Sequence, residues 1–231
     1  MTENQTYLLV ISPHPDDCEF GVSGTVARLV KEGKQVVYVI CTNGDKGTGD
    51  RTLTPEQLAV IREKEQLAAA DLLGVKETFF LRYPDQGLED GHQFRRDLVR
   101  VIRRYSPFAV ATADPYRKYI WHRDHRITGL VTLDAVFPCA RDHLAYPELL
   151  EEGLEPHKVK EIWFWGTEDP NYRLDITDTL ETKFAALACH KSQVGSLSPE
   201  LKDRMLNFAR RNAQGEEFEL AEAFHRIELR N

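Results

Sequence analysis

The sequence contains little of what would mark a secreted, membrane-bound or nucleic-acid-binding protein. Its four cysteines are far apart and include no C-x-x-C pair, so we interpret them as reduced thiols and expect no disulfide framework. No apolar run approaches the roughly 18 residues that a membrane span requires, so we expect no membrane partner. Acidic residues (37) outnumber basic residues (30) and give a formal net charge of −7, which argues against nucleic acid as a partner.

The beginning of the chain, MTENQ, has neither the basic segment nor the apolar segment of a secretory signal peptide. Together with the reduced cysteines, this predicts a cytoplasmic protein. No internal repeat, low-complexity tract or linker interrupts the chain. Its 231 residues, 42% of them hydrophobic, are enough for a packed core, and we expect one domain over residues 1–231.

The first residues of this domain have the pattern of a strand–helix–strand unit. Residues 6–11 and 35–40 are short, nearly unbroken apolar runs rich in β-branched side chains, as in strands that are covered on both faces of a parallel sheet. Between them, residues 24–34 carry Val26 and Leu29 at helical spacing and predict a helix.

The alternation of strands and helices continues to about residue 137. Thr54 and Pro55 predict the start of a helix, and Gly74 predicts its end. The other predicted elements in this region are strands over 78–81 and 108–112 and a helix over 94–105. The pattern predicts an α/β fold with a Rossmann-like, mostly parallel sheet and helices on both faces.

After residue 137 the regular alternation is lost, and we expect a decorated C-terminal third. Residues 138–160 resemble an irregular insertion, residues 161–165 predict a strand, and residues 178–190 and 198–212 predict capped helices.

Ligands of open α/β sheets bind beyond the carboxyl ends of the strands, and the loops at these positions are unusually polar in this sequence. The loop after the first strand contains His14 and Asp17, and the segment after the fourth contains His122 and His125. Each pair is three residues apart, which places its members on one side of a helical turn. Two imidazoles, a carboxylate and an open position form the ligand pattern of a catalytic zinc. We therefore predict a metal site made by the first pair and by one or both histidines of the second pair.

Asp16 is adjacent to Asp17, so it cannot point in the same direction toward the metal. Its predicted role is that of a general base, which accepts a proton from water. A histidine of the second pair that does not bind metal would stabilise an oxyanion or protonate the leaving amine. The alternative interpretation is that these side chains are only turn residues and caps.

Several motifs follow one another in a distinctive order. In chain order they are His14-Pro15-Asp16-Asp17, Glu19, Gly21, Gly24, Thr25, Thr42-Asn43-Gly44-Asp45, Gly47, Arg62, Glu65, Pro84-Asp85 and His122-x-x-His125. This set resembles the LmbE/PIG-L family, the zinc-dependent deacetylases of N-acetylglucosamine conjugates, over most of residues 6–135. Within the family, the sequence is most similar to the archaeal-type diacetylchitobiose deacetylases, and the resemblance implies an LmbE-like fold.

The resemblance also implies a role for each residue of the polar loops. It implies that His14, Asp17 and His125 are the zinc ligands. It further implies that Asp16 is the base and that His122 is the oxyanion or acid residue.

Three more residues are implied to bind substrate. Arg62 and Asp85 match positions that face sugar hydroxyls in the family, and His190 matches a late His-x-Ser-Gln element near the pocket. Read from the sequence alone, these residues are a helix surface residue, a turn residue and a residue that closes a helix, respectively. Arg123 stands where the family usually has proline, a change that affects the rigidity of the loop rather than its ligands.

We therefore expect a hydrolase that removes the N-acetyl group from a GlcNAc-containing sugar or conjugate and releases acetate and a free amine. Zn²⁺ is the expected cofactor, although the same ligands suit other divalent metals. A small amino sugar is the expected partner, and the resemblance implies a homo-oligomer, a trimer or a hexamer. The alternatives are an amidase for a larger acyl group, a non-catalytic sugar-binding relative, and a phosphoesterase, which would often need two metal ions.

Overall fold

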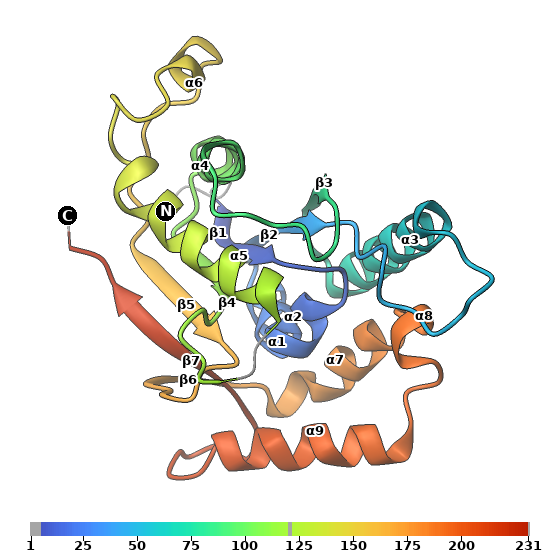
Figure 1. The fold of residues 1–231 in the computed structure, drawn as a ribbon. Helices are drawn as coiled ribbons and strands as arrows, with labels where there is room; N and C mark the ends of the chain where they lie inside the picture. The colour runs from blue at the N-terminus through green and yellow to red at the C-terminus, as the bar shows by residue number, and fades with distance from the viewer. Residues whose placement is uncertain (1–5, 120–121, 231) are drawn as a thin grey trace.

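The structure, a computed structural model, describes residues 6–119 and 122–230. Within these ranges one seven-stranded sheet has the order β3-β2-β1-β4-β5-β7-β6 (Figure 1). The strands are β1 (Thr6–Ser12), β2 (Gln35–Thr42), β3 (Glu77–Tyr83), β4 (Ala109–Ala113), β5 (Glu161–Trp165), β6 (Tyr172–Asp175) and β7 (Ala221–Glu228). The first five run parallel, whereas β7 is antiparallel to both β5 and β6. The predicted α/β fold with a mostly parallel sheet is confirmed.

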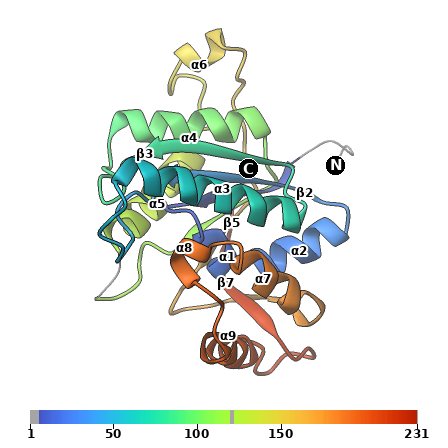
Figure 2. The same cartoon turned by 90° about the vertical axis from the view of Figure 1, so that its right-hand side faces the viewer.

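Helices cover both faces of the sheet (Figures 1 and 2). On one face lie α4 (His92–Tyr105) and α5 (Arg123–Asp134), and on the other lie α2 (Ser23–Lys31), α3 (Pro55–Leu73) and α7 (Leu180–Leu187). The strands alternate between the two cores: Leu9 and Ile11 of β1 pack on the α4 side, and Leu8 and Val10 pack on the α2 side. Because both faces are covered, β1, β2 and β4 are almost entirely buried and mostly apolar.

The C-terminal third adds elements that the sequence pattern did not predict. The strands β6 and β7 extend the sheet at one edge. Apolar and polar residues do not alternate simply along β7, because Glu222 is buried in an ion pair with Lys183 (Nζ to Oε1, 2.5 Å). The helix predicted over 178–190 is shorter, since α7 ends at Leu187 and His190 precedes a separate short helix, α8 (Lys191–Val194). The final helix, α9 (Pro199–Asn212), lies where it was expected.

Differences at the front of the chain are smaller. A short helix, α1 (Asp17–Gly21), precedes α2, and the helix expected over 24–34 begins at Ser23 and ends at Lys31. The four cysteines are free thiols, two of them buried. Among the described residues, no helix combines the length and the apolarity needed to cross a membrane.

The irregular insertion predicted over 138–160 is present and contains only the short helix α6 (Glu148–Glu151). It projects from the body above α4 (Figure 1). The buried Arg103 of α4 fixes its base, because the guanidinium donates to the main-chain oxygens of Cys139, Ala140 and Asp142, among others. One buried cation thus satisfies several carbonyl groups of an irregular segment.

The helix α5, which carries the predicted ligand His125, packs closely against β4. A Cβ on Gly129 of α5 would lie 2.4 Å from the Ala113 carbonyl oxygen of β4, far inside van der Waals contact. Only glycine therefore allows the backbone of this helix to approach the strand so closely.

We predict that Gly129→Ala lowers the free energy of unfolding by about 1–3 kcal/mol because the added methyl forces α5 away from β4. Urea denaturation followed by circular dichroism measures this loss. Gly91→Ala is the control, since its Cβ would have no neighbour closer than 4.0 Å. An equal loss in both variants would contradict the packing argument.

Candidate functional site

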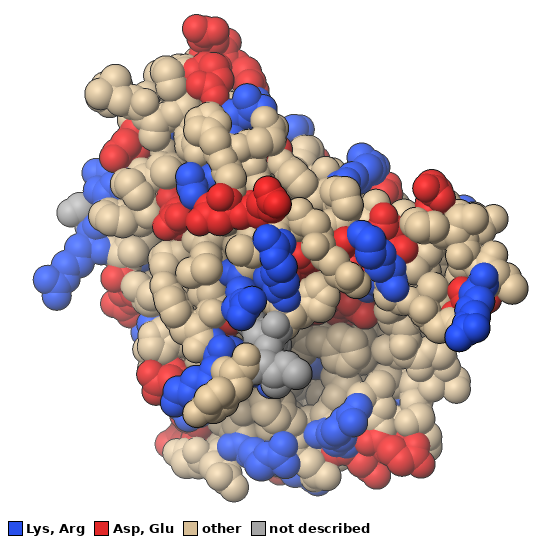
Figure 3. Space-filling view, viewed as in Figure 1, with Lys and Arg blue, Asp and Glu red and all other residues tan. Residues whose placement is uncertain are grey.

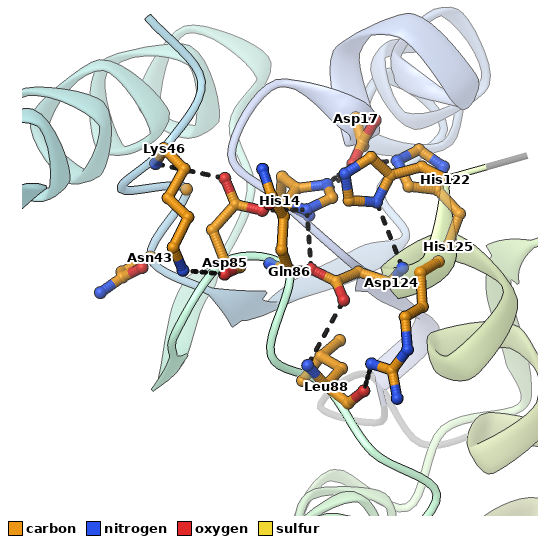
Figure 4. A network of polar contacts seen from close by, with 12 residues as sticks. His14, Asp17, Asn43, Lys46, Asp85, Gln86, Leu88, His122, Asp124 and His125 are labelled. Atoms are coloured by element: carbon orange, nitrogen blue, oxygen red, sulfur yellow. Dashed lines mark hydrogen bonds and ion pairs between the residues drawn. The ribbon is translucent and has the colours of Figure 1, made fainter.

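Three segments at the carboxyl ends of parallel strands bring polar side chains together. The loop after β1 carries His14 and Asp17, the loop after β3 carries Asp85, and the segment after β4 leads into α5 with Asp124 and His125. Figure 4 shows these side chains converging on His14. The predicted location at the carboxyl edge of the sheet matches the rule for open α/β sheets.

The predicted metal ligands meet at one carboxylate oxygen. Asp17 Oδ2 lies 3.0 Å from His14 Nδ1 and 3.1 Å from His125 Nε2. Burial opposes the charge of Asp17, but the two imidazoles, His125 first, outweigh it and hold the pKa of Asp17 far below its ordinary value. Two imidazole nitrogens and a carboxylate are a donor set that suits zinc, so these residues fit such an ion.

The other nitrogen of His14 is held by two further carboxylates. Its Nε2 lies 3.0 Å from Asp85 Oδ1 and 3.3 Å from Asp124 Oδ2. Burial lowers the pKa of His14, but its hydrogen bonds with Asp124, Asp17 and Asp85 outweigh burial and raise the pKa to about 11. Carboxylates in this position fix the tautomer and the ring orientation of a histidine that binds metal through its other nitrogen. His14 Nδ1 is therefore the nitrogen that faces the candidate ion.

Asp124 also ties the loop after β3 to the start of α5. Its carboxylate is fully buried and accepts hydrogen bonds from the main-chain N–H groups of Gln86 (2.6 Å) and Leu88 (3.3 Å). The Asp124 side chain thus connects the start of α5 to the loop after β3 and to His14. No role for Asp124 follows from the sequence alone.

His122 lies beside the cluster and caps α5. Its Nδ1 accepts a hydrogen bond from the Asp124 N–H (3.2 Å), and its ring packs edge-on against His14 with 4.7 Å between centroids. Burial and the neighbouring imidazoles of His14 and His125 lower the pKa of His122, which favours the neutral ring. Since Nδ1 is the acceptor, the proton of the neutral ring resides on Nε2, where it can be donated.

Other groupings of ligand atoms are also close enough to hold an ion. Within the described residues, one such set is His14, His122 and His125, and another is His14, Asp85, His122 and Asp124, each with its ligand atoms within 4.8 Å of one another. We favour the set that contains Asp17, because His122 Nδ1 is already engaged by the helix N-terminus and Asp17 contacts both remaining histidines.

Asp16 has a strained backbone and a buried side chain. Its φ of 87° is left-handed, which is rare outside glycine and marks a position held by its surroundings. The Asp16 N–H donates to Gln66 Oε1 (2.9 Å), and the Arg62 Nη2 donates to Asp16 Oδ1 (3.2 Å). Burial, and then the charge of Asp17, raise the pKa of Asp16 to about 7 despite Arg62. A carboxyl group with a pKa near neutrality can both accept and return a proton.

A chain of fully buried polar side chains begins at Gln66, which accepts the hydrogen bond from the Asp16 N–H. Gln66 Nε2 donates to both carboxylate oxygens of Glu19 (3.1 and 3.2 Å), and Glu19 Oε2 lies 2.9 Å from His190 Nε2. All three side chains have 0% exposure. The chain connects α3, α1 and the segment before α8, so the C-terminal third helps to position the loop after β1.

The three residues predicted to bind substrate have partners within the protein. Arg62 donates to the main-chain oxygens of Gly44 and Pro15 as well as to Asp16. Asp85 contacts His14, and His190 contacts Glu19. Their contact with a substrate stays a prediction.

Two residues of this network, Gln66 and Glu19, carry no predicted role. Glu19 belongs to the ordered set of family-like motifs over residues 14–125. Gln66 stands four residues after Arg62, on the same face of α3. That spacing is the signal that could have found Gln66.

The fold and the cluster define an α/β protein with a candidate His/Asp metal site at the carboxyl edge of its sheet. Residues 9–136 match the family model described as PIG-L: GlcNAc-PI de-N-acetylase. The chain belongs to the PIG-L family. The match includes every residue of the metal cluster and ends well before His190.

Individual relatives agree with the family match. The chain is 37% identical over 186 residues to a diacetylchitobiose deacetylase of Thermococcus kodakarensis, which covers 80% of this chain and 69% of the relative. The solved structure of an N,N'-diacetylchitobiose deacetylase from Pyrococcus horikoshii, complexed with an inhibitor, superposes with a TM-score of 0.90 at 33% identity, over 98% of this chain and 85% of that one. A probable N-acetyl-alpha-D-glucosaminyl L-malate deacetylase 2 of Bacillus anthracis is 27% identical over 205 residues, which are 87% of each chain.

We predict that Asp85→Asn weakens zinc binding about 10- to 100-fold, because His14 loses a charged partner that orients its ring. Competition with a chromogenic chelator measures the affinity. Asp71→Asn is the matched control, since Asp71 is exposed on α3. Equal affinities in the two variants would show that Asp85 does not orient a metal ligand.

Proposed function

We propose that this protein is a zinc-dependent deacetylase that hydrolyses the acetamido group of an N-acetylglucosamine-containing sugar or conjugate. The observation that carries the proposal is the meeting of His14, Asp17 and His125 at one point, with Asp16 beside them. Family membership and the similarity to diacetylchitobiose deacetylases support the substrate class. A diacetylchitobiose-type sugar is the proposed substrate. Homo-oligomerisation and a cytoplasmic location stay predictions.

Zinc would be held by His14 Nδ1, Asp17 and His125 Nε2. An ion there would act as a Lewis acid, which polarises the amide carbonyl and makes water a better nucleophile near neutral pH. Asp85 and Asp124 hold His14 in the orientation that this binding needs.

The protein's own side chains move the protons. Asp16 takes a proton from water as the water oxygen attacks the carbonyl carbon, and then gives that proton to the amide nitrogen as the C–N bond breaks. His122 donates a hydrogen bond from Nε2 to the carbonyl oxygen as negative charge develops on it. The C–O bond that forms and the C–N bond that breaks leave acetate and a free amine.

The geometry also bears on the rival functions. A protein that only binds sugar has no need for a buried carboxyl group held in a left-handed conformation beside a metal site, because such strain is retained where the surroundings enforce it for a purpose. A two-metal phosphoesterase needs two ions about 3.5–4 Å apart. Among the described residues, the two ion-holding groupings share His14 and His122, so they do not provide two separate sites.

We predict that the zinc-loaded protein releases acetate from diacetylchitobiose or from another member of a panel of GlcNAc, GlcNAc-malate and GlcNAc-inositol. Treatment with a chelator should abolish the activity, and added zinc should restore it. Metal analysis should give about one ion per chain, because the two ion-holding groupings share His14 and His122 and therefore form a single site. Activity that is indifferent to the chelator, or two tightly bound ions, would contradict the proposal.

We further predict that Asp16→Asn lowers kcat by a factor of about 10²–10⁴, the usual contribution of a general acid–base group, while zinc content stays at the wild-type level. Asp17→Asn should lose both zinc and activity. Acetate release and metal analysis of the two purified variants separate the base from the ligand. Near-normal turnover by Asp16→Asn would exclude it as the base.

A further inference from the structure

A cavity of about 630 Å³ lies beside the candidate metal site. Asp17 and His125 form part of its wall, and most of the rest comes from α1, α7, α9, the turn after β5 and the strand β7. Figure 3 shows this face of the molecule hollowed above α9, with basic side chains along the lower rim. Cavities of this size hold drug-sized ligands, whereas the methyl of an acetyl group would fill a small part of it.

The wall of this cavity is mostly apolar. Phe20, Trp165, Met205 and Phe208 line it. Phe20 is 41% exposed and Phe208 is 55% exposed, so large apolar surfaces face the open space. Apolar surfaces of this kind beside a reaction centre favour an apolar ligand group.

One buried ion pair in the wall is satisfied by the protein itself, whereas Arg117, Arg204 and Arg211 supply further cationic groups to the lining. Lys183 Nζ lies 2.5 Å from Glu222 Oε1 and donates to the Phe20 carbonyl oxygen (2.8 Å). Glu222 in turn accepts hydrogen bonds from the N–H groups of Gly24 and Thr25. This buried pair therefore needs no charge from a ligand.

The position of the cavity relative to the metal cluster indicates which end of the substrate points into it. In Figure 4, Asp85 lies on one side of His14, and Asp17 and His125 lie on the other. Of the described residues, those lining the cavity include Asp17 and His125 but neither Arg62 nor Asp85. In an N-acyl sugar the carbonyl carbon stands between the sugar and the acyl chain. A sugar held by Arg62 and Asp85 therefore directs the acyl chain toward the cavity.

We propose that this cavity is an acyl-chain subsite, and that the protein hydrolyses N-acylglucosamines whose linear acyl chain is longer than acetyl. The inference rests on the proposed amide hydrolysis and extends its substrate class. The reaction is the same: water adds its oxygen to the carbonyl carbon, the C–N bond breaks, and one proton of water goes to the amine nitrogen. The products are a fatty carboxylic acid and glucosamine.

The test is a series of N-acetyl-, N-butyryl- and N-hexanoylglucosamine with the zinc-loaded protein. We expect kcat/KM to rise by about fourfold for each methylene that enters the cavity. Phe208→Ala should lower kcat/KM for the hexanoyl substrate at least about tenfold by removing apolar contact, and should leave the value for the acetyl substrate within about twofold. Phe137→Ala is the matched control, because Phe137 is similarly exposed (50%) and does not line the cavity.

Calorimetric titration of N-hexanoylglucosamine into Asp16→Asn gives a readout that does not depend on turnover. We expect Phe208→Ala to weaken this binding and Phe137→Ala to leave it unchanged.

The outcomes separate this inference from the proposed function. Hydrolysis of the acetyl substrate without hydrolysis or binding of the longer chains would overturn the subsite and leave the deacetylase intact. An octyl glycoside of GlcNAc tests the other possible occupant. If it had a higher kcat/KM than GlcNAc and Phe208→Ala abolished that increase, the cavity would bind the glycosidic substituent, which would overturn the acyl assignment. Binding of the hexanoyl sugar that depends on Phe208, without turnover of any substrate, would support the subsite and contradict the hydrolase.

Discussion

A single carboxylate oxygen, Asp17 Oδ2, lies about 3 Å from one nitrogen of His14 and from one nitrogen of His125. These residues come from loops more than a hundred positions apart, and they meet because the carboxyl ends of β1 and β4 are adjacent in the sheet. Asp85 and Asp124 complete the arrangement by holding the far nitrogen of His14. Such a concentration of negative charge around imidazoles is stable when a cation balances it, and a divalent ion is the cation that the donor atoms suit.

Around this point the protein separates its polar and apolar functions. On one side, Arg62 and the chain from Gln66 through Glu19 to His190 hold Asp16 in its left-handed conformation. On the other side, the apolar cavity is lined mostly by the C-terminal third, which the family match does not include. The chemistry of the sheet edge and a substrate preference set mostly by the C-terminal elements would then reside in different parts of one chain.

The sequence predicted the parts of the structure that local patterns determine. The apolar runs of β1 and β2 and the capped helix that begins at Pro55 were found because burial on both faces and capping leave local signatures. The strand β7 was missed because Glu222 interrupts its apolar face and is neutralised by Lys183, 39 residues away in sequence. The role of Asp124 was missed because it depends on contacts between loops that no spacing rule encodes, whereas Gln66 could have been found from its position four residues after Arg62. The sheet edge that carries the His/Asp cluster could be predicted because motif spacing and sheet topology both point to it, whereas the choice of His14, Asp17 and His125 as the ligands came from the family resemblance and stays a prediction.

The most direct test of the account is a crystal structure of the zinc-loaded protein, with anomalous diffraction collected at the zinc absorption edge. The account predicts one anomalous peak per chain, about 2.0–2.2 Å from His14 Nδ1, an Asp17 carboxylate oxygen and His125 Nε2. A peak bound instead by His122, Asp85 and Asp124, or no peak at this edge of the sheet, would contradict it.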